Sequence, residues 1–197
     1  MKVTVNLQKG QEISLDKEAG GSLTQIVMGL GWNAVKKSGG FFSGVFGGGG
    51  VEIDLDTSCL MFDEQKQLVD IAWFRQLQSR DGSVAHTGDQ RIGDDGDDEQ
   101  IKVDLSRVPP QVKSLVFMVN SFTGHSFLHV ANAFCRIVDS EGNREIARYD
   151  LSVQGTHSAQ FMAKLYRDNG EWKMHAIGEN GTGRTFQDLM PQILPHL

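Results

Sequence analysis

Short segments in which apolar residues occupy every second position recur along the chain, and this periodicity constrains the fold most strongly. It is seen in residues 51–56, 101–105 and 172–176, as expected for strands with one buried face. Residues 115–119 and 135–138 are apolar at higher density, and the first of these suits a central strand covered on both faces. Polar turn signals separate the segments. The sequence therefore predicts a mainly β protein, a two-sheet β-sandwich.

One short helix is predicted, at the C-terminal end of the chain. Residues 185–194 would form it with Thr185 as the N-cap, and Pro191 is expected to interrupt or kink it because proline removes a backbone donor. The first eight residues alternate between apolar and polar, which predicts a strand of the fold rather than a signal peptide. With 197 residues and no linker or internal repeat, the chain is predicted to be a single domain, residues 1–197.

Cysteine usage and hydropathy indicate a cytoplasmic protein. Cys59 and Cys135 lie in apolar runs and lack the spacing of a disulfide or redox pair, so both are predicted to be buried and free. No stretch has the roughly 18 apolar residues of a transmembrane helix.

Residues 36–50 are rich in glycine and phenylalanine and are predicted to form a flexible loop. The alternative is that this loop docks on a protein partner or a membrane surface, so peripheral membrane association stays open.

The net charge of −6 is concentrated in one part of the chain. Residues 81–99 hold seven Asp or Glu residues and a single arginine, so this segment carries the whole net charge. An acidic balance argues against binding to duplex nucleic acid, whose phosphates need basic partners. A segment of this kind must either be solvated and mobile or hold cations in the folded state.

The densest part of this acidic segment, residues 88–99, has six carboxylates and three glycines. Two carboxylates about 5 Å apart repel each other by about 3 kcal/mol at an effective dielectric constant of about 20. Ca²⁺ relieves such repulsion and accepts about six to eight oxygen ligands in a flexible geometry. The spacing is not that of an EF-hand.

Glu52, Asp54 and Asp56 share one face of a predicted strand. Asp54 and Asp56 could complete a cation site if that face meets the acidic segment; a solvated outer face is the alternative.

Two stretches that include the ends of the acidic segment carry a family resemblance. Residues 79–89 read SRDGSVAHTGD and residues 96–105 read GDDEQIKVDL. With them, the chain resembles the TerD family of tellurium-resistance proteins, a group of bacterial stress-response proteins. Supporting matches, which extend the resemblance over nearly the whole chain, lie at residues 7–11, 29–32, 54–56, 165–167 and 170–173.

The resemblance implies a β-sandwich that binds Ca²⁺ through the acidic loop, has no established catalytic activity, and acts in resistance to tellurite and related stresses. Protein partners from the same resistance system are expected, and nucleic acid is not. Carried onto this chain, the resemblance implies that the metal ligands are Asp89, Asp97, Asp98 and Glu99, with Asp94, Asp95, Asp54 and Asp56 as further candidates.

The sequence leaves three hypotheses open for the function. The first is a Ca²⁺-stabilised binding and assembly module with no catalytic residues. The second is a phosphoester hydrolase whose carboxylates hold Mg²⁺ or Mn²⁺ for attack by metal-bound water, although Arg91 is the only cation within the loop to hold a phosphate. The third treats the acidic loop as a docking element for a basic partner. Nucleotide binding and serine hydrolysis are not predicted, because the chain has no P-loop, dinucleotide fingerprint or nucleophile elbow.

Overall fold

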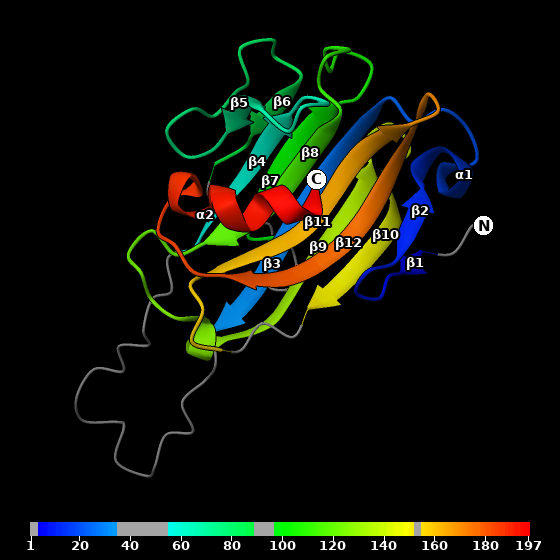
Figure 1. Cartoon of the computed structure of the whole chain (residues 1–197). Coiled ribbons are helices and arrows are strands. Elements are labelled where there is room, and N and C mark those ends of the chain that lie inside the picture. Colours follow the sequence, from blue (N-terminus) through cyan, green and yellow to red (C-terminus); the bar gives the residue numbers. More distant parts are fainter. Residues whose placement is uncertain (1–3, 35–54, 89–96, 152–154) are drawn as a thin grey trace.

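Two six-stranded sheets lie face to face, and the alternating segments 101–105 and 172–176 contribute strands to them (Figure 1). The computed structural model describes residues 4–34, 55–88, 97–151 and 155–197. Within these residues, all neighbouring strands pair in antiparallel fashion except β1 and β10, which are parallel. The prediction of a mainly β, two-sheet sandwich is confirmed.

Sheet A and sheet B have the following strands, each in spatial order. Sheet A contains β1 (Val5–Asn6), β10 (Arg144–Leu151), β9 (Val130–Asp139), β3 (Gln25–Ala34), β7 (Glu99–Asp104) and β6 (Val84–His86). Sheet B contains β2 (Glu12–Ser14), β12 (Glu171–Gly181), β11 (Ala159–Asp168), β8 (Ser114–Asn120), β4 (Asp56–Phe62) and β5 (Leu68–Ala72).

The main hydrophobic core lies between the sheets and is built from every second residue of the facing strands. Such burial stabilises the fold by about 1.5–3 kcal/mol for each large apolar side chain. Sheet A contributes Ile26, Met28, Leu30, Ile101, Val103, Cys135 and Ile137, and sheet B contributes Cys59, Met61, Leu115, Phe117 and Val119. The period of two seen in the sequence therefore marks the inner face of each sheet.

A second core covers the outer face of sheet B. The C-terminal helix α2 (Phe186–Ile193) lies across this face (Figure 1). Leu189 and Ile193 of the helix are buried in the same cluster as Val116 and Met118 of β8. Because Leu115, Phe117 and Val119 of β8 face the main core, this strand is covered on both sides, as predicted.

The helix α2 begins where it was predicted to begin, but it does not stop at Pro191 as expected. Thr185 is the N-cap and forms a capping box with Asp188. Pro191 does not interrupt the helix, which continues to Ile193 and leads into a 3₁₀ turn, η2 (Leu194–His196). A proline in the second turn of so short a helix removes one backbone hydrogen bond, and burial of Leu189 and Ile193 offsets that loss.

Several local features extend or correct the predictions. The helix α1 (Leu15–Ala19) and the 3₁₀ turn η1 (Phe127–His129) were not predicted, since elements this short show no periodicity. Asn169 and Gly170 both have positive φ (51° and 85°) and form the tight turn between β11 and β12. Residues 36–50 and 51–54 lie outside the described residues.

Both cysteines are free and buried, as predicted. In the part of the chain that the structure describes, no helix is long and apolar enough to cross a membrane.

Candidate metal centre

The structure places four of the eight predicted metal ligands. These are Asp56, at the start of β4, and the consecutive residues Asp97, Asp98 and Glu99, which lead into β7. The other four, Asp54, Asp89, Asp94 and Asp95, lie outside the described residues.

Glu99 points between the two sheets, on the same side of β7 as the core residue Ile101. Its Oε2 accepts a hydrogen bond from the backbone N–H of Thr57 at 2.8 Å. Thr57 directly follows Asp56, so this bond brings the start of β4 beside the start of β7. The ends of the two segments that the sequence analysis suggested might meet, one on each sheet, therefore lie close together at one end of the sandwich.

His86, on β6, completes this buried contact. Its Nδ1 accepts a hydrogen bond from the Gly88 N–H at 2.9 Å, which places the proton of the neutral ring on Nε2. Nε2 lies 2.9 Å from Thr57 Oγ1 and 3.3 Å from Glu99 Oε2. Burial favours a raised pKa for Glu99, but the hydrogen bonds from His86 and Thr57 outweigh it and hold the pKa below its usual range.

Asp98 joins the end of the acidic segment to β3. Its Oδ2 accepts the backbone N–H of Trp32 at 2.7 Å, and its own N–H donates to the carbonyl oxygen of Leu30 at 2.9 Å. Residues 29–32, one of the matches that support the family resemblance, thus lie directly against the acidic segment.

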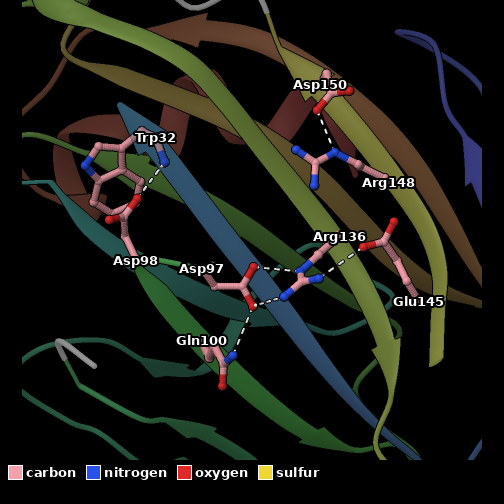
Figure 2. Close-up of polar contacts among 8 residues, drawn as sticks. All are labelled: Trp32, Asp97, Asp98, Gln100, Arg136, Glu145, Arg148 and Asp150. Carbon is pink, nitrogen blue, oxygen red and sulfur yellow. Dashed lines mark hydrogen bonds and ion pairs between the residues drawn. The ribbon is translucent and has the colours of Figure 1, made fainter. Parts of the chain in front are cut away.

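Asp97 turns to the outer face of sheet A, where Arg136 of β9 binds it (Figure 2). The guanidinium donates from Nε to Oδ1 at 2.7 Å and from Nη2 to Oδ2 at 3.0 Å. Oδ2 also accepts from Gln100 Nε2 at 2.9 Å, and Arg136 Nη1 donates to Glu145 Oε2 at 3.1 Å. Asp97 is only 1% exposed, and this two-bond ion pair neutralises it without a metal.

Glycine at position 29 makes room for this ion pair. A Cβ atom at Gly29 would overlap the carboxylate of Asp97. Gly31 has the same relation to the ring of Phe134. These glycines are therefore required by the close approach of Phe134 of β9 and of Asp97, which lies two residues before β7.

Arg136 was missed by sequence reasoning, although a signal was present. It is the only charged residue in the apolar run 133–138, and an arginine in such a run needs a partner. His86 was not proposed as a site residue either, because its contacts come from β4 and β7, which are distant in sequence.

The chemistry of the donors suits a hard cation, and the described residues supply only part of a site. Carboxylate oxygens are the ligands that Ca²⁺ prefers, and Asp98 and Glu99 present them beside the start of β4. Across residues 4–34, 55–88, 97–151 and 155–197, no three His, Cys, Asp or Glu side chains are arranged to hold a metal. A complete site therefore needs ligands from the rest of the acidic segment.

The fold and the acidic segment together define a class of protein: a two-sheet β-sandwich in which consecutive carboxylates at the start of β7 bind the backbone of both sheets. The TerD domain model matches residues 3–192, and the chain belongs to the TerD family. The family resemblance drawn from the sequence is confirmed.

Named relatives and a solved structure agree with this assignment. Tellurium resistance protein TerZ of Serratia marcescens is 47% identical over 191 residues, covering 96% of this chain and 97% of the relative. Stress response protein SCP2 of Bacillus subtilis is 40% identical, covering 95% and 98%. The crystal structure of a homologue of the telluride resistance protein TerD from Streptomyces coelicolor has a TM-score of 0.64 at 18% identity, covering 86% and 96%. This last likeness concerns the fold.

Proposed function

We propose that this protein is a calcium-binding module of the bacterial stress response that contributes to tellurium resistance without chemistry of its own. Relatives named for tellurium resistance and for stress response match it along almost the whole chain. That similarity supports a role in tellurium resistance and the stress response. The geometry of the acidic end of the sandwich supports the calcium site.

The hydrogen bond from the Thr57 N–H to Glu99 carries the proposal. It brings the start of β4, with Asp56, to the start of β7, which directly follows the acidic segment in sequence. Asp98 binds β3 at the same end. Asp98 and Glu99 are thus held at one end of the sandwich by bonds that do not depend on a cation, which favours a partly preformed site.

We assign different roles to the three consecutive carboxylates. Asp98 and Glu99 are ligands, together with Asp56 and the predicted ligands Asp54, Asp89, Asp94 and Asp95. Asp97 is a positioning residue, because Arg136 already neutralises it. When bound, Ca²⁺ would neutralise the remaining acidic residues and order the segment that contains them.

The state of the two thiols supports a non-enzymatic role. Reduction of tellurite by the protein itself would consume accessible thiolates. Burial raises the pKa of Cys135 to about 12 and raises that of Cys59 further. Neither thiol is therefore suited to redox chemistry at neutral pH.

Calorimetry on the chelator-treated protein tests the calcium proposal. We expect Ca²⁺ to bind with micromolar or tighter affinity and Mg²⁺ to bind far more weakly. Asp94→Asn combined with Asp95→Asn should weaken Ca²⁺ binding by at least tenfold, since each neutralised ligand loses its charge interaction with the ion. Glu18→Gln combined with Glu64→Gln removes the same charge elsewhere and should leave the affinity unchanged.

Unaltered Ca²⁺ affinity in the Asp94 and Asp95 variant would reject the site. The hydrolase alternative is tested in parallel with a panel of phosphoesters and Mg²⁺ or Mn²⁺. Turnover that disappears in the same variant would replace the non-enzymatic proposal with the hydrolase.

A further inference from the structure

Three loops bring aromatic rings and arginines together at the surface beside sheet B. The loops follow β5, follow β8 and precede α2 (Figure 1). We call this set the arginine–aromatic surface; it comprises Trp73, Phe74, Arg75, Leu77, Phe122 and Arg184. It adjoins the start of β4, because Asp56 pairs across the strands with Asn120, whose side chain binds the Arg184 carbonyl; the proposed function does not use it.

The aromatic rings pack edge to face into a continuous cluster. Ring centroids are 4.8 Å apart for Trp73 and Phe74, and 5.5 Å apart for Phe74 and Phe122. Trp73 also packs on Phe186 of α2 at 5.1 Å, which joins the cluster to the second core. The surface therefore rests on a packed part of the molecule.

Two guanidinium groups cover these rings. Arg75 lies 5.6 Å from the ring centroid of Trp73, 5.2 Å from that of Phe74 and 5.5 Å from that of Phe122. Arg184 lies 5.8 Å from the Phe122 centroid. Both cations thus lie near one ring, so this part of the surface attracts an anion.

Hydrogen bonds fix the loops in place before any partner binds. Asn120 Nδ2 donates to the carbonyl oxygen of Arg184 at 2.8 Å, and Arg184 Nε donates to that of Phe122 at 3.0 Å. Trp73 and Gln76 exchange two backbone hydrogen bonds, of 2.9 and 3.0 Å. A surface ordered in this way loses little conformational entropy on binding.

No direct ion pair balances the positive charge of this surface within the described residues. Neither the Arg75 nor the Arg184 guanidinium forms an ion pair there. The carboxylate near Arg184 is that of Asp188, which accepts hydrogen bonds from the start of α2. Next to the cations, Phe74 is 38% exposed and Leu77 is 50% exposed.

We propose that the arginine–aromatic surface binds an acidic segment of a partner protein, with a carboxylate between Arg75 and Arg184 and an apolar side chain against Phe74 and Leu77. Arginine and aromatic residues dominate the energetics of protein interfaces. The guanidiniums cover the rings that bases would stack on. A peptide partner therefore fits this surface better than a single-stranded nucleic acid.

Selection from a phage-displayed library of random peptides on the immobilised full chain tests this proposal. We expect the selected peptides to be enriched in Asp and Glu beside a large apolar residue. Their affinity is then measured by fluorescence anisotropy. Arg75→Gln combined with Arg184→Gln should weaken binding by about tenfold or more, because the carboxylate loses both charged donors.

A matched control removes the same charge from another part of the surface. Lys102→Gln combined with Lys113→Gln replaces two exposed lysines and should change the affinity by less than about twofold. Thermal melts of all variants check that each is folded.

Three results would overturn the proposal. One is that no peptide is selected, or that the selected peptides lack acidic residues. Another is equal binding of the peptides by the double arginine variant. The third is binding of labelled oligouridine or of phosphatidylserine vesicles, lost in that variant, which would assign the surface to nucleic acid or to a membrane.

Discussion

Three consecutive carboxylates at the start of β7 have three different environments. Asp97 is bound by a guanidinium, Asp98 by a backbone N–H of β3, and Glu99 by a backbone N–H of β4 together with an imidazole. Similar residues adjacent in sequence therefore differ in how much of their charge is already compensated. That difference separates the positioning residue from the proposed ligands.

Replacing Arg136 should show how much its ion pair with the buried Asp97 contributes to the free energy of unfolding. Arg136→Met keeps an unbranched stem but leaves Asp97 without its charged donor. We expect a loss of about 3 kcal/mol in the free energy of unfolding, at the lower end of the usual range for a broken buried pair, since the Arg136 side chain is 28% exposed. Urea denaturation measures this loss.

Arg148, paired across the strands with Arg136, provides the control. It forms an ion pair with the exposed Asp150 and lies over the ring of Phe134. Arg148→Met should therefore cost only about 1 kcal/mol. Equal losses in the two variants would contradict the special role of the Asp97–Arg136 pair.

A methyl group at position 29 should break the Asp97–Arg136 ion pair by displacing Asp97 instead of removing Arg136. In Gly29→Ala the new Cβ would occupy the place of the Asp97 carboxylate, which must move away from Arg136. We expect a loss of about 2–4 kcal/mol, from overpacking and from unsatisfied buried charge. Gly21→Ala has open space around it and should change stability by less than about 1 kcal/mol. Thermal or urea unfolding of the two variants distinguishes these outcomes.

At the scale of elements, Asp70 of β5 fixes the loop that carries part of the arginine–aromatic surface. Its carboxylate accepts hydrogen bonds from Ile71 N at 2.9 Å, Gln76 Nε2 at 2.9 Å and Arg80 N at 2.7 Å. Burial favours a raised pKa, but these bonds outweigh it and hold the pKa of Asp70 below its ordinary value of 3.8.

The lowered pKa predicts how stability depends on pH. The ionised carboxylate stabilises the fold fully above the unfolded pKa of 3.8, and this contribution is lost as pH falls through the lower folded pKa. Asp70→Asn should therefore be less stable than the wild type by about 1–3 kcal/mol at neutral pH. The difference should shrink as the pH is lowered past the unfolded value. Urea unfolding along a pH series measures it, and a pH-independent difference would argue against the ionised state as its source.

Element type was predicted correctly for the segments around Ile101, Phe117 and Met174. The first and last follow the alternation of a half-buried strand, and the segment around Phe117 is the dense apolar run of a strand covered on both faces. The helix α1 was not predicted, because a helix of five residues cannot show a period of 3.6. Continuation of α2 past Pro191 depends on burial against sheet B, which local sequence does not reveal.

The sequence predicted which residue types make up the candidate site, but it predicted only part of their arrangement in space. Crowded carboxylates indicate a cation site from sequence alone. The pairing of Asp97 with Arg136 joins residues that are 39 positions apart, and the Thr57–Glu99 bond spans 42 positions. Such contacts follow from the order of strands in the two sheets, which periodicity does not determine.

At the scale of the whole molecule, the outer faces of the two sheets differ. The outer face of sheet B is covered by α2 and buries Leu189 and Ile193. The outer face of sheet A carries the Asp97–Arg136–Glu145 network. Because neither the second core nor this network contains a proposed calcium ligand, substitutions in either should change stability and leave cation binding unchanged.

A substitution in the second core tests this separation. Leu189→Ala should lower the free energy of unfolding by about 2–5 kcal/mol, since the side chain is fully buried, and leave Ca²⁺ affinity unchanged. Leu194→Ala, at a position that is 36% exposed, should cost less than about 1 kcal/mol. Urea unfolding and calorimetry provide the two measurements. A weakened Ca²⁺ affinity in Leu189→Ala would show that the second core is coupled to the proposed calcium ligands.

Linkage between Ca²⁺ binding and unfolding distinguishes a ligand from a positioning residue. At a free Ca²⁺ concentration about 100 times the Kd, binding to the folded state adds about 2.7 kcal/mol. For a chain of 197 residues this corresponds to a rise in Tm of about 5–11 °C. Asp98→Asn retains an oxygen acceptor for the Trp32 N–H, so it should reduce this rise while changing the Tm without Ca²⁺ only slightly.

Arg136→Met should show the opposite pattern in the same melts. It lowers the Tm with and without Ca²⁺ by similar amounts, because it removes a contact present in both states and leaves the ligands in place. Scanning calorimetry of the wild type and both variants, with Mg²⁺ in place of Ca²⁺ as the control, measures the two increments. If Arg136→Met removed the Ca²⁺-dependent rise and Asp98→Asn kept it, Asp97 would be assigned as the ligand and Asp98 as the residue that positions the segment.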